Sequence, residues 1–420
     1  MTTSHNTDEL FRRNVHSYAW FQFASSLLGW LPVFFLYFNQ YVGLTDVIKL
    51  SDIYYLSVCI FEVPSGYFSD RFGRRKTLLI SGVSFIFSYF LFLFSANFIG
   101  LACGQIFLAL GIAMMSGTDS AFLYDSLSAL NCEEEYAGHE ARAQKFGFIA
   151  LSIASLLGGA LGSWNLHLPY VLSLFGAIWM VWLGWRFVEP ERPVNISIDT
   201  GSFIQAVISS LSYLKSPILR WLFGVMVLMY CLEHVAYEFY QPYIQLLQIN
   251  WLNENPAPLI SGVIIATSMF GGALGAMYSI RLRDTIGIKA LLFIAFGIQL
   301  SIIAGLSFVL SLVILSLVMF RNFPMAMIHA PVNAMIAPRV NSELRATYLS
   351  IQSLSARLVF SILLYFLTYS IEGTDEVSWP ALSSVLQITF VLGIAGSLFF
   401  VFIGPKISDK AETKIDQDTN

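Results

Sequence analysis

The sequence predicts an all-α polytopic membrane protein in which twelve transmembrane helices form two six-helix bundles. Hydrophobic residues make up 56% of the 420-residue chain, charged residues make up only 12%, and 36 residues are phenylalanine. A single soluble core could not bury that much apolar surface, so the bilayer must act as solvent for the rest. Long apolar segments recur along the whole chain, and one polar break divides them into two sets.

Each predicted span is an apolar segment close to the roughly 20 residues that a helix needs to cross a hydrocarbon core of about 30 Å. The segments are 15–37, 51–69, 77–96, 99–127, 146–163, 168–188, 218–247, 259–280, 288–308, 310–336, 345–370 and 380–403. The seventh segment is among the most polar and contains Pro242. Because proline removes a backbone donor, we expect Pro242 to break that helix where protein or a cavity satisfies the freed group.

The positions of lysine and arginine predict the orientation. With a cytoplasmic N-terminus, most of the 23 Lys and Arg residues fall at cytoplasmic loops and helix ends. Lys49 falls on the opposite face, and Arg321 and Arg357 fall within spans. This asymmetry predicts a multi-pass protein with both termini in the cytoplasm. The membrane that we expect it to span is the bacterial plasma (inner) membrane.

The longest polar stretch between two spans runs from Glu189 to Ser216 and separates sets of similar length. That layout is expected when two bundles face each other across a central cavity. The predicted parts are an N-terminal bundle over 1–190, a cytoplasmic linker over 191–217, a C-terminal bundle over 218–405 and a cytoplasmic tail over 406–420. Within this stretch, residues 202–214 are expected to form an amphipathic helix on the membrane surface.

The pentapeptide Gly-Gly-Ala-Leu-Gly occurs twice, at 158–162 and 271–275. Small residues at this spacing let helix backbones approach closely in lipid. Close packing is the simpler interpretation, and sliding of these helices during a conformational cycle is the alternative.

Residues 66–75 read Gly-Tyr-Phe-Ser-Asp-Arg-Phe-Gly-Arg-Arg and connect two apolar segments. From the residue types alone, Gly66 would permit close helix packing, Asp70 would cap or pair at a helix end, and Gly73 would permit a tight turn. A role limited to membrane orientation would explain the arginines, but it would explain neither Asp70 nor the glycines.

This run resembles the signature loop of the major facilitator superfamily, Gly-x-x-x-Asp-Arg-x-Gly-Arg-Arg/Lys, which joins the second and third helices. The twelve spans, the central break and the cytoplasmic termini extend the resemblance over the whole chain. It implies the fold of that superfamily and a conformational latch in which the aspartate and second arginine pair with each other and with an acid at the end of helix four. The implied latch residues here are Gly66, Asp70, Arg71, Gly73, Arg74 and Asp125.

Ionisable residues far from helix ends form a second group of candidates, because each costs at least about 2.5 to 3.5 kcal/mol at the bilayer centre. They are Glu62, Asp119, Glu233, Glu238, Arg321 and Arg357. The resemblance implies that helices one, four, seven and ten line the cavity, so that the four of these residues on helices four, seven and ten reach substrate or a coupling proton. An arginine that moves away from a carboxylate would then change whether that carboxylate holds a proton. Structural ion pairs of Glu233 or Glu238 with Arg321 or Arg357 are the alternative.

Polar residues of the seventh and tenth spans are candidate substrate contacts. They are Tyr237, Tyr240, Gln241, Asn322 and Asn333. For the tyrosines, an aromatic belt at the outer interface is the competing explanation. His234 follows Glu233 in sequence, which places it about 100° round the helix, and we expect it to be structural.

Transport direction follows from weaker patterns. Antiporters of the superfamily commonly carry Gly-Pro-x-x-Gly-Gly in helix five and an arginine in helix four, whereas this chain has Ala154-Ser155-Leu156-Leu157-Gly158-Gly159 and Phe107. In contrast, Glu62-Val63-Pro64-Ser65-Gly66 and Arg345-Ala346-Thr347-Tyr348-Leu349-Ser350 resemble a prokaryotic efflux-like branch. We expect proton-coupled efflux of a drug or metabolite, a siderophore-like compound included, by alternating access. Proton-coupled import is the alternative, and a non-transporting receptor or scaffold is a third.

The chain contains no His-Glu-x-x-His, Gly-x-x-x-x-Gly-Lys or Gly-x-Ser-x-Gly motif, so we expect neither an enzyme nor ATP-driven transport. The four cysteines have no metal-site or disulfide spacing. We expect no cofactor, metal or nucleic-acid partner. The expected partners are a small-molecule substrate, protons and the lipid bilayer, and the expected state is a monomer because one chain holds both bundles.

Overall fold

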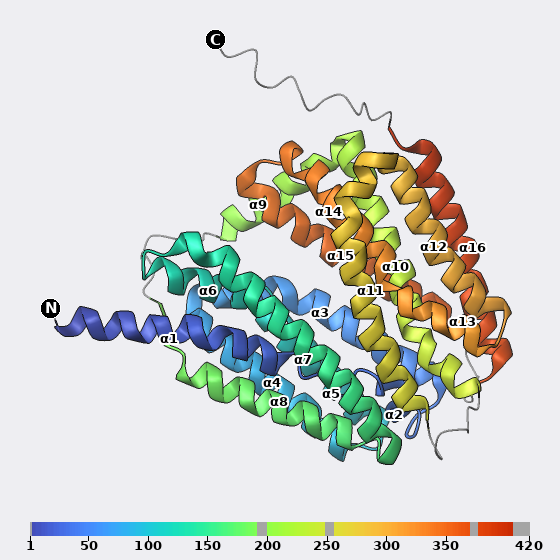
Figure 1. Cartoon of the computed structure of the whole chain (residues 1–420), viewed down its shortest axis with the longest axis horizontal. Helices are drawn as coiled ribbons and strands as arrows, with labels where there is room; N and C mark the ends of the chain where they lie inside the picture. Colours follow the sequence, from blue (N-terminus) through green and yellow to red (C-terminus); the bar gives the residue numbers. More distant parts are fainter. Residues whose placement is uncertain (1, 191–199, 248–255, 370–376, 406–420) are drawn as a thin grey trace, which may run out of the picture.

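The computed structural model describes residues 2–190, 200–247, 256–369 and 377–405, and every regular element among them is helical (Figure 1). The first set of helices is α1 (Thr2–Ser25), α2 (Phe34–Phe38), α3 (Leu44–Phe72), α4 (Arg74–Phe94), α5 (Phe98–Met115), α6 (Thr118–Ser128), α7 (Tyr136–Trp164) and α8 (Leu168–Arg186). The second set is α9 (Thr200–Ser212), α10 (Pro217–Leu246), α11 (Ala257–Ile286), α12 (Ile288–Phe308), α13 (Leu312–Leu317), α14 (Asn322–Ile336), α15 (Ser342–Tyr369) and α16 (Trp379–Ile403).

Ten helices of the described residues are long and apolar enough to cross a membrane, which confirms the all-helical membrane fold. The spans expected at 15–37 and 51–69 are not among the ten, so the count of twelve is not reproduced. The first of them is divided between α1 and α2, since α1 ends at Ser25 and turns follow. The second falls in α3, where Asp52 and Glu62 lie within the expected span and lower its hydropathy.

Some predicted single spans are interrupted. Gly117, with φ of 73°, separates α5 from α6, and a 3₁₀ turn at Val318–Phe320 separates α13 from α14. The expectation for Pro242 was wrong, because α10 continues through it to Leu246. Proline removes one backbone hydrogen bond and its ring crowds the carbonyl four residues earlier, but the hydrogen bonds of the neighbouring residues can still hold the turn.

Helices α1 to α8 pack mainly with one another, as do α10 to α16. The two sets meet where α3 contacts α15, α7 contacts α11, and α2 contacts α10 (Figure 1). Of the predicted linker, 191–199 lie outside the described residues, and α9 packs against α15. The predicted tail, 406–420, lies outside the described residues.

Both Gly-Gly-Ala-Leu-Gly segments lie at close helix contacts. A Cβ added to Gly159 would lie 2.6 Å from the carbonyl oxygen of Pro258 in α11, and one added to Gly275 would lie 2.6 Å from the carbonyl oxygen of Phe323 in α14. Such distances leave no room for a side chain, so these backbones pack directly.

The molecule has two ends, which the junctions between helices define. The motif end is the end at which Gly73 joins α3 to α4 and Gly287 joins α11 to α12. The far end is the opposite one, at which α2 lies and Asn97 begins α5.

Candidate functional site

A cavity of about 370 Å³ lies between the two sets of helices. It is lined by α3, α5, α10 and α15 and by the segment around the start of α2. Its polar lining is Ser51, Tyr54, Tyr55, Gln105, Tyr230, His234, Tyr237, Glu238 and Arg357. Its apolar lining is Leu28, Trp30, Leu31, Phe34, Val58, Leu108 and Ile112. This size and this mixture of aromatic walls with a few polar groups suit a small organic molecule.

Glu238 supplies the carboxylate of the cavity. Its Oε2 accepts a hydrogen bond from Ser51 Oγ and its Oε1 accepts one from Tyr55 OH, each over 3.0 Å. Both donors come from α3, so the carboxylate on α10 is held from the other set of helices. Within the described part of the chain, no lysine, arginine or histidine forms an ion pair with Glu238.

Arg357 lines the same cavity from α15 but is paired with Glu62 of α3. The distance from Arg357 Nη1 to Glu62 Oε2 is 2.7 Å, and the side chains are 24% and 14% exposed. One turn nearer the far end, Ser361 Oγ donates a hydrogen bond to Asp52 of α3. Two polar contacts therefore join α3 to α15 along one wall of the cavity.

Arg321 lies behind the cavity wall. Its guanidinium carbon is 4.7 Å from the centroid of the Tyr237 ring, and its Nη1 is 3.7 Å from Glu233 Oε1. The Arg321 side chain is only 6% exposed. Because Tyr237 lines the cavity and the other two residues do not, the Glu233–Arg321 pair supports the wall from outside.

His234 lines the cavity, which its sequence position did not reveal. Its ring stacks on that of Tyr230 with the centroids 3.7 Å apart, and its Nδ1 is 3.0 Å from the Tyr230 carbonyl oxygen. Since a carbonyl only accepts, Nδ1 carries the proton and Nε2 is the acceptor nitrogen of the neutral ring.

Gln241 closes the cavity toward the far end. Its Oε1 accepts a hydrogen bond from the backbone N–H of Phe35 at 3.0 Å, and its Nε2 donates to the carbonyl of Leu31 at 3.1 Å. It follows Glu238 by one turn of α10, a rise of about 4.5 Å. Gln241 is fully buried, as is Tyr240, whose hydroxyl lies 2.7 Å from Ser261 Oγ. These two predicted contact residues thus tie helices together beyond the cavity lining.

Other candidates from the sequence also lie away from the cavity. Asp119 accepts hydrogen bonds from Gln22 Nε2 at 2.5 Å and from the Ser120 backbone N–H at 2.8 Å, nearer the motif end. Asn322 packs against Gly272 of α11, and Asn333 is next to His329 on α14. Among the described residues, no three His, Cys, Asp or Glu side chains gather as metal ligands would.

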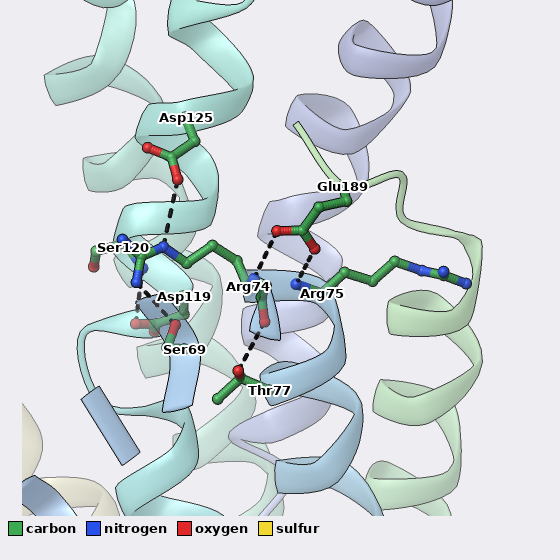
Figure 2. A network of polar contacts seen from close by, with 9 residues as sticks. Ser69, Arg74, Arg75, Thr77, Asp119, Ser120, Asp125 and Glu189 are labelled. Carbon is green, nitrogen blue, oxygen red and sulfur yellow. Dashed lines mark hydrogen bonds and ion pairs between the residues drawn. The ribbon is translucent and has the colours of Figure 1, made fainter. Parts of the chain in front are cut away.

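Two of the predicted latch residues, Arg74 and Asp125, meet at the motif end (Figure 2). Arg74 Nε lies 3.4 Å from Asp125 Oδ2 at the end of α6, and Arg74 Nη1 donates to Ser69 Oγ at 2.9 Å. Glu189, which the sequence analysis did not single out, accepts hydrogen bonds from the backbone N–H groups of Arg74 and Arg75 at 2.7 and 2.8 Å. A carboxylate at this position caps the first turn of α4, and its negative charge interacts favourably with the helix dipole.

Gly73 is the only residue between α3 and α4, and its φ of 108° is open mainly to glycine. A Cβ there would lie 2.9 Å from the Glu189 carboxyl carbon. Gly66 is different, because a Cβ there would meet nothing within 4 Å, so the expected close packing at Gly66 is absent from this conformation. Arg71 contacts the rings of Tyr67 and Phe72, and the side chain of Asp70 lies outside the described residues.

Sequence reasoning missed several cavity residues. Ser51, Tyr54 and Tyr55 lie near the far end of α3, whose polar character was visible in the sequence but was not assigned to the cavity. Gln105 was a further signal, since it is an amide within an apolar helix. The side on which each residue faces could not be read without the packing of α3 against α5 and α15.

Comparisons with known proteins agree on the architecture. The family model described as Major Facilitator Superfamily matches residues 18–364, which include every residue that lines the cavity. The tetracycline resistance protein, class H, of Pasteurella multocida is 27% identical over 153 residues, which are 34% of this chain and 36% of that protein. The match thus spans about a third of the curated relative's length.

Solved structures are similar over almost the whole chain. The nucleoside transporter NupG superposes with a TM-score of 0.74 at 11% identity, over 93% of this chain and 98% of that one. The D-xylose-proton symporter gives 0.68 at 15% identity, over 94% and 98%. A bacterial homolog of the human lysosomal transporter Spinster, in an inward-facing and unoccupied conformation, gives 0.65 at 14% identity, over 94% and 96%. At these identities the likeness shows the fold alone.

Proposed function

The chain belongs to the major facilitator superfamily, and from this premise we propose that it exports a small organic solute in exchange for protons by alternating access. The single observation that carries the proposal is the cavity between the two sets of helices, which contains a carboxylate held by both sets. A site shared between two moving halves can change its exposure and its contacts together, which is what alternating access requires.

Glu238 is the proposed coupling residue. Its hydrogen-bond donors lie on α3 and the carboxylate lies on α10, so relative movement of these helices would remove the donors from the carboxylate. A carboxylate that loses donors binds a proton more readily. Conformational change would thereby alternate Glu238 between binding and releasing a proton.

Export is preferred over import because of the resemblance to a tetracycline resistance protein. A drug or metabolite is accordingly the proposed cargo. Import is the alternative, since the D-xylose-proton symporter has a similar fold. The proposed location is the inner membrane with both termini cytoplasmic, which makes the motif end the cytoplasmic one.

The proposed latch is the Arg74–Asp125 contact together with the Glu189 cap of α4. It would hold the cytoplasmic ends of α3, α4, α6 and α8 as one body during the cycle. The proposed division into moving parts follows the polar break, with residues 1–190 as one half and 218–405 as the other.

Purified protein in proteoliposomes with an internal pH-sensitive dye tests the proposal. A panel of drugs, iron chelators, nucleosides and sugars is added with and without an imposed pH gradient, and solute and proton movements are both recorded. Opposite movements of solute and proton support export by exchange, and parallel movements support the import alternative. Solute movement in the Glu238→Gln variant that still follows the pH gradient would contradict the role of Glu238. Asp284→Asn at the motif end is the matched control, because Asp284 is 58% exposed and lies on α11, which contributes no residue to the cavity lining.

A further inference from the structure

Some of the hydrogen-bonding groups that line the cavity are already paired, and others are not. Several donors of the lining already form hydrogen bonds within the protein. Ser51 and Tyr55 donate to Glu238. Trp30 Nε1 donates to Tyr89 OH at 3.2 Å, and His234 Nδ1 donates to a backbone carbonyl. Acceptors remain. Each Glu238 oxygen accepts one of these bonds, although a carboxylate oxygen can accept two.

Gln105 provides a second acceptor. Its side chain lines the cavity from α5, is 5% exposed, and has an Oε1 without a hydrogen-bond partner among the described residues. A buried acceptor without a partner costs free energy of folding, which a ligand N–H would recover once rotation of the Gln105 side chain presents Oε1 to the cavity.

The charges of the lining favour the same kind of ligand. Arg357 is compensated by Glu62 at 2.7 Å, so its positive charge is already balanced. Arg321 lies behind Tyr237 and is 3.7 Å from Glu233. Glu238 has no such ion pair within the described residues, so its carboxylate, when ionised, adds a negative charge to the cavity that is not paired with a cation there.

Aromatic rings surround this charge. Phe34 and Tyr237 stack with centroids 5.6 Å apart, and Tyr54 and Tyr55 meet edge to face at 5.1 Å. The faces of aromatic rings attract cations, and the attraction grows where water is excluded; Arg321 already lies over the Tyr237 ring, which leaves the other rings of the lining for a ligand.

We infer that the cavity selects a monovalent organic cation, a protonated amine on an aromatic or otherwise apolar body, whose N–H groups meet Glu238 and Gln105. This inference rests on the proposed function only in taking the cavity as the transport site. Neutral and anionic compounds of the same shape bind more weakly, because they leave the Glu238 charge unpaired or oppose it.

The test uses three compounds that share one ring system: 1-naphthylmethylamine, which is cationic at neutral pH, the neutral 1-naphthylmethanol and the anionic 1-naphthoate. Binding to the full chain in lipid nanodiscs is measured by isothermal titration calorimetry. The amine should bind at least about tenfold more tightly than the alcohol. A hydrogen bond to a charged group is stronger than one between neutral groups by about 1.4 kcal/mol, which corresponds to a tenfold change in Kd. Glu238→Gln should reduce the amine-to-alcohol ratio to near one, and Gln105→Leu should lower it partly.

Asp284→Asn should keep the wild-type ratio, and a thermal unfolding curve for each variant shows that it is folded. Equal affinities for the three compounds, no measurable binding of the amine, or an unchanged ratio in folded Glu238→Gln would each overturn the inference. The two measurements distinguish a failure of the inferred cation binding from a failure of the proposed transport function. An amine that binds with the expected ratio but drives no flux in proteoliposomes leaves the cation site standing and removes the proposed transport function.

Discussion

The Glu62 carboxylate lies 2.7 Å from the Arg357 guanidinium and joins α3 to α15 across the boundary between the two sets of helices. Removal of one partner leaves the other charge without its counterion in an apolar surrounding. Removal of both charges leaves no unpaired charge. We expect Arg357→Ala to destabilise the protein by up to about 3 kcal/mol, and the double variant Glu62→Gln/Arg357→Gln to destabilise it less. Thermal unfolding in detergent measures both. An Arg357→Ala variant as stable as wild type would show that the pair contributes little.

The latch geometry predicts opposite outcomes for two glycines of one motif. Gly73→Ala should lower the Tm, because alanine at φ of 108° is strained by about 1 to 3 kcal/mol and its Cβ would approach Glu189. Gly66→Ala is the matched control and should leave the Tm unchanged or higher, since its Cβ meets nothing within 4 Å. If Gly66→Ala keeps its Tm but loses transport, then Gly66 packs closely in another conformation of the cycle. Equal Tm values for both variants would argue against the strain at Gly73.

The contact between α7 and α11 predicts that the far end opens when a side chain is inserted. A Cβ at Gly262 would press on the Ser155 carbonyl oxygen and lie 3.2 Å from Gly159 Cα. We therefore expect Gly262→Ala to expose residues at the far end to a membrane-impermeant thiol reagent, scored with single cysteines on a cysteine-free background. Gly297→Ala on α12 is the control, because a Cβ there meets nothing within 4 Å. Equal labelling rates in the two variants would rule out the direct packing as the closure of that end.

Gln241 predicts a second way to loosen the far end. Without its amide, Phe35 N–H and Leu31 C=O lose their partner from α10. Spin labels at Asn39→Cys and Gln245→Cys, two residues whose side chains meet at 3.4 Å, report the distance between the sets of helices. Gln241→Ala should lengthen or broaden this distance distribution, and Gln144→Ala on the exposed side of α7 should not. An unchanged distribution in Gln241→Ala would place the closure elsewhere.

Much of the architecture could be predicted from the sequence because hydropathy and loop charge act locally. The apolar segments gave helices close to their expected bounds, and the turn at Gly73 followed from its residue type. The path of the first span could not be predicted in this way. The turns after Ser25 are held by contacts with distant residues, as when the Trp30 N–H donates to Ser173 Oγ of α8.

Only some residues of the site could be predicted from the sequence. Buried charge identified Glu238 and Arg357, and the structure places both in the cavity lining. Polarity alone also selected Gln241, which the structure uses to tie α10 to Leu31 and Phe35. Polar residues that face a cavity and polar residues that bond to another helix have the same sequence signal, so only the packing separates them.

The most direct test of the account is proton release when solute binds to the purified protein. The protein is held in weakly buffered detergent solution with a pH indicator, and the tightest-binding compound of the panel is added. If solute and proton compete for Glu238, wild type and Asp284→Asn should release protons at saturation, up to one for each molecule, and Glu238→Gln should release none. Solute binding to the wild type without proton release at any pH between about 5 and 9, or equal release by Glu238→Gln, would contradict proton exchange at this carboxylate.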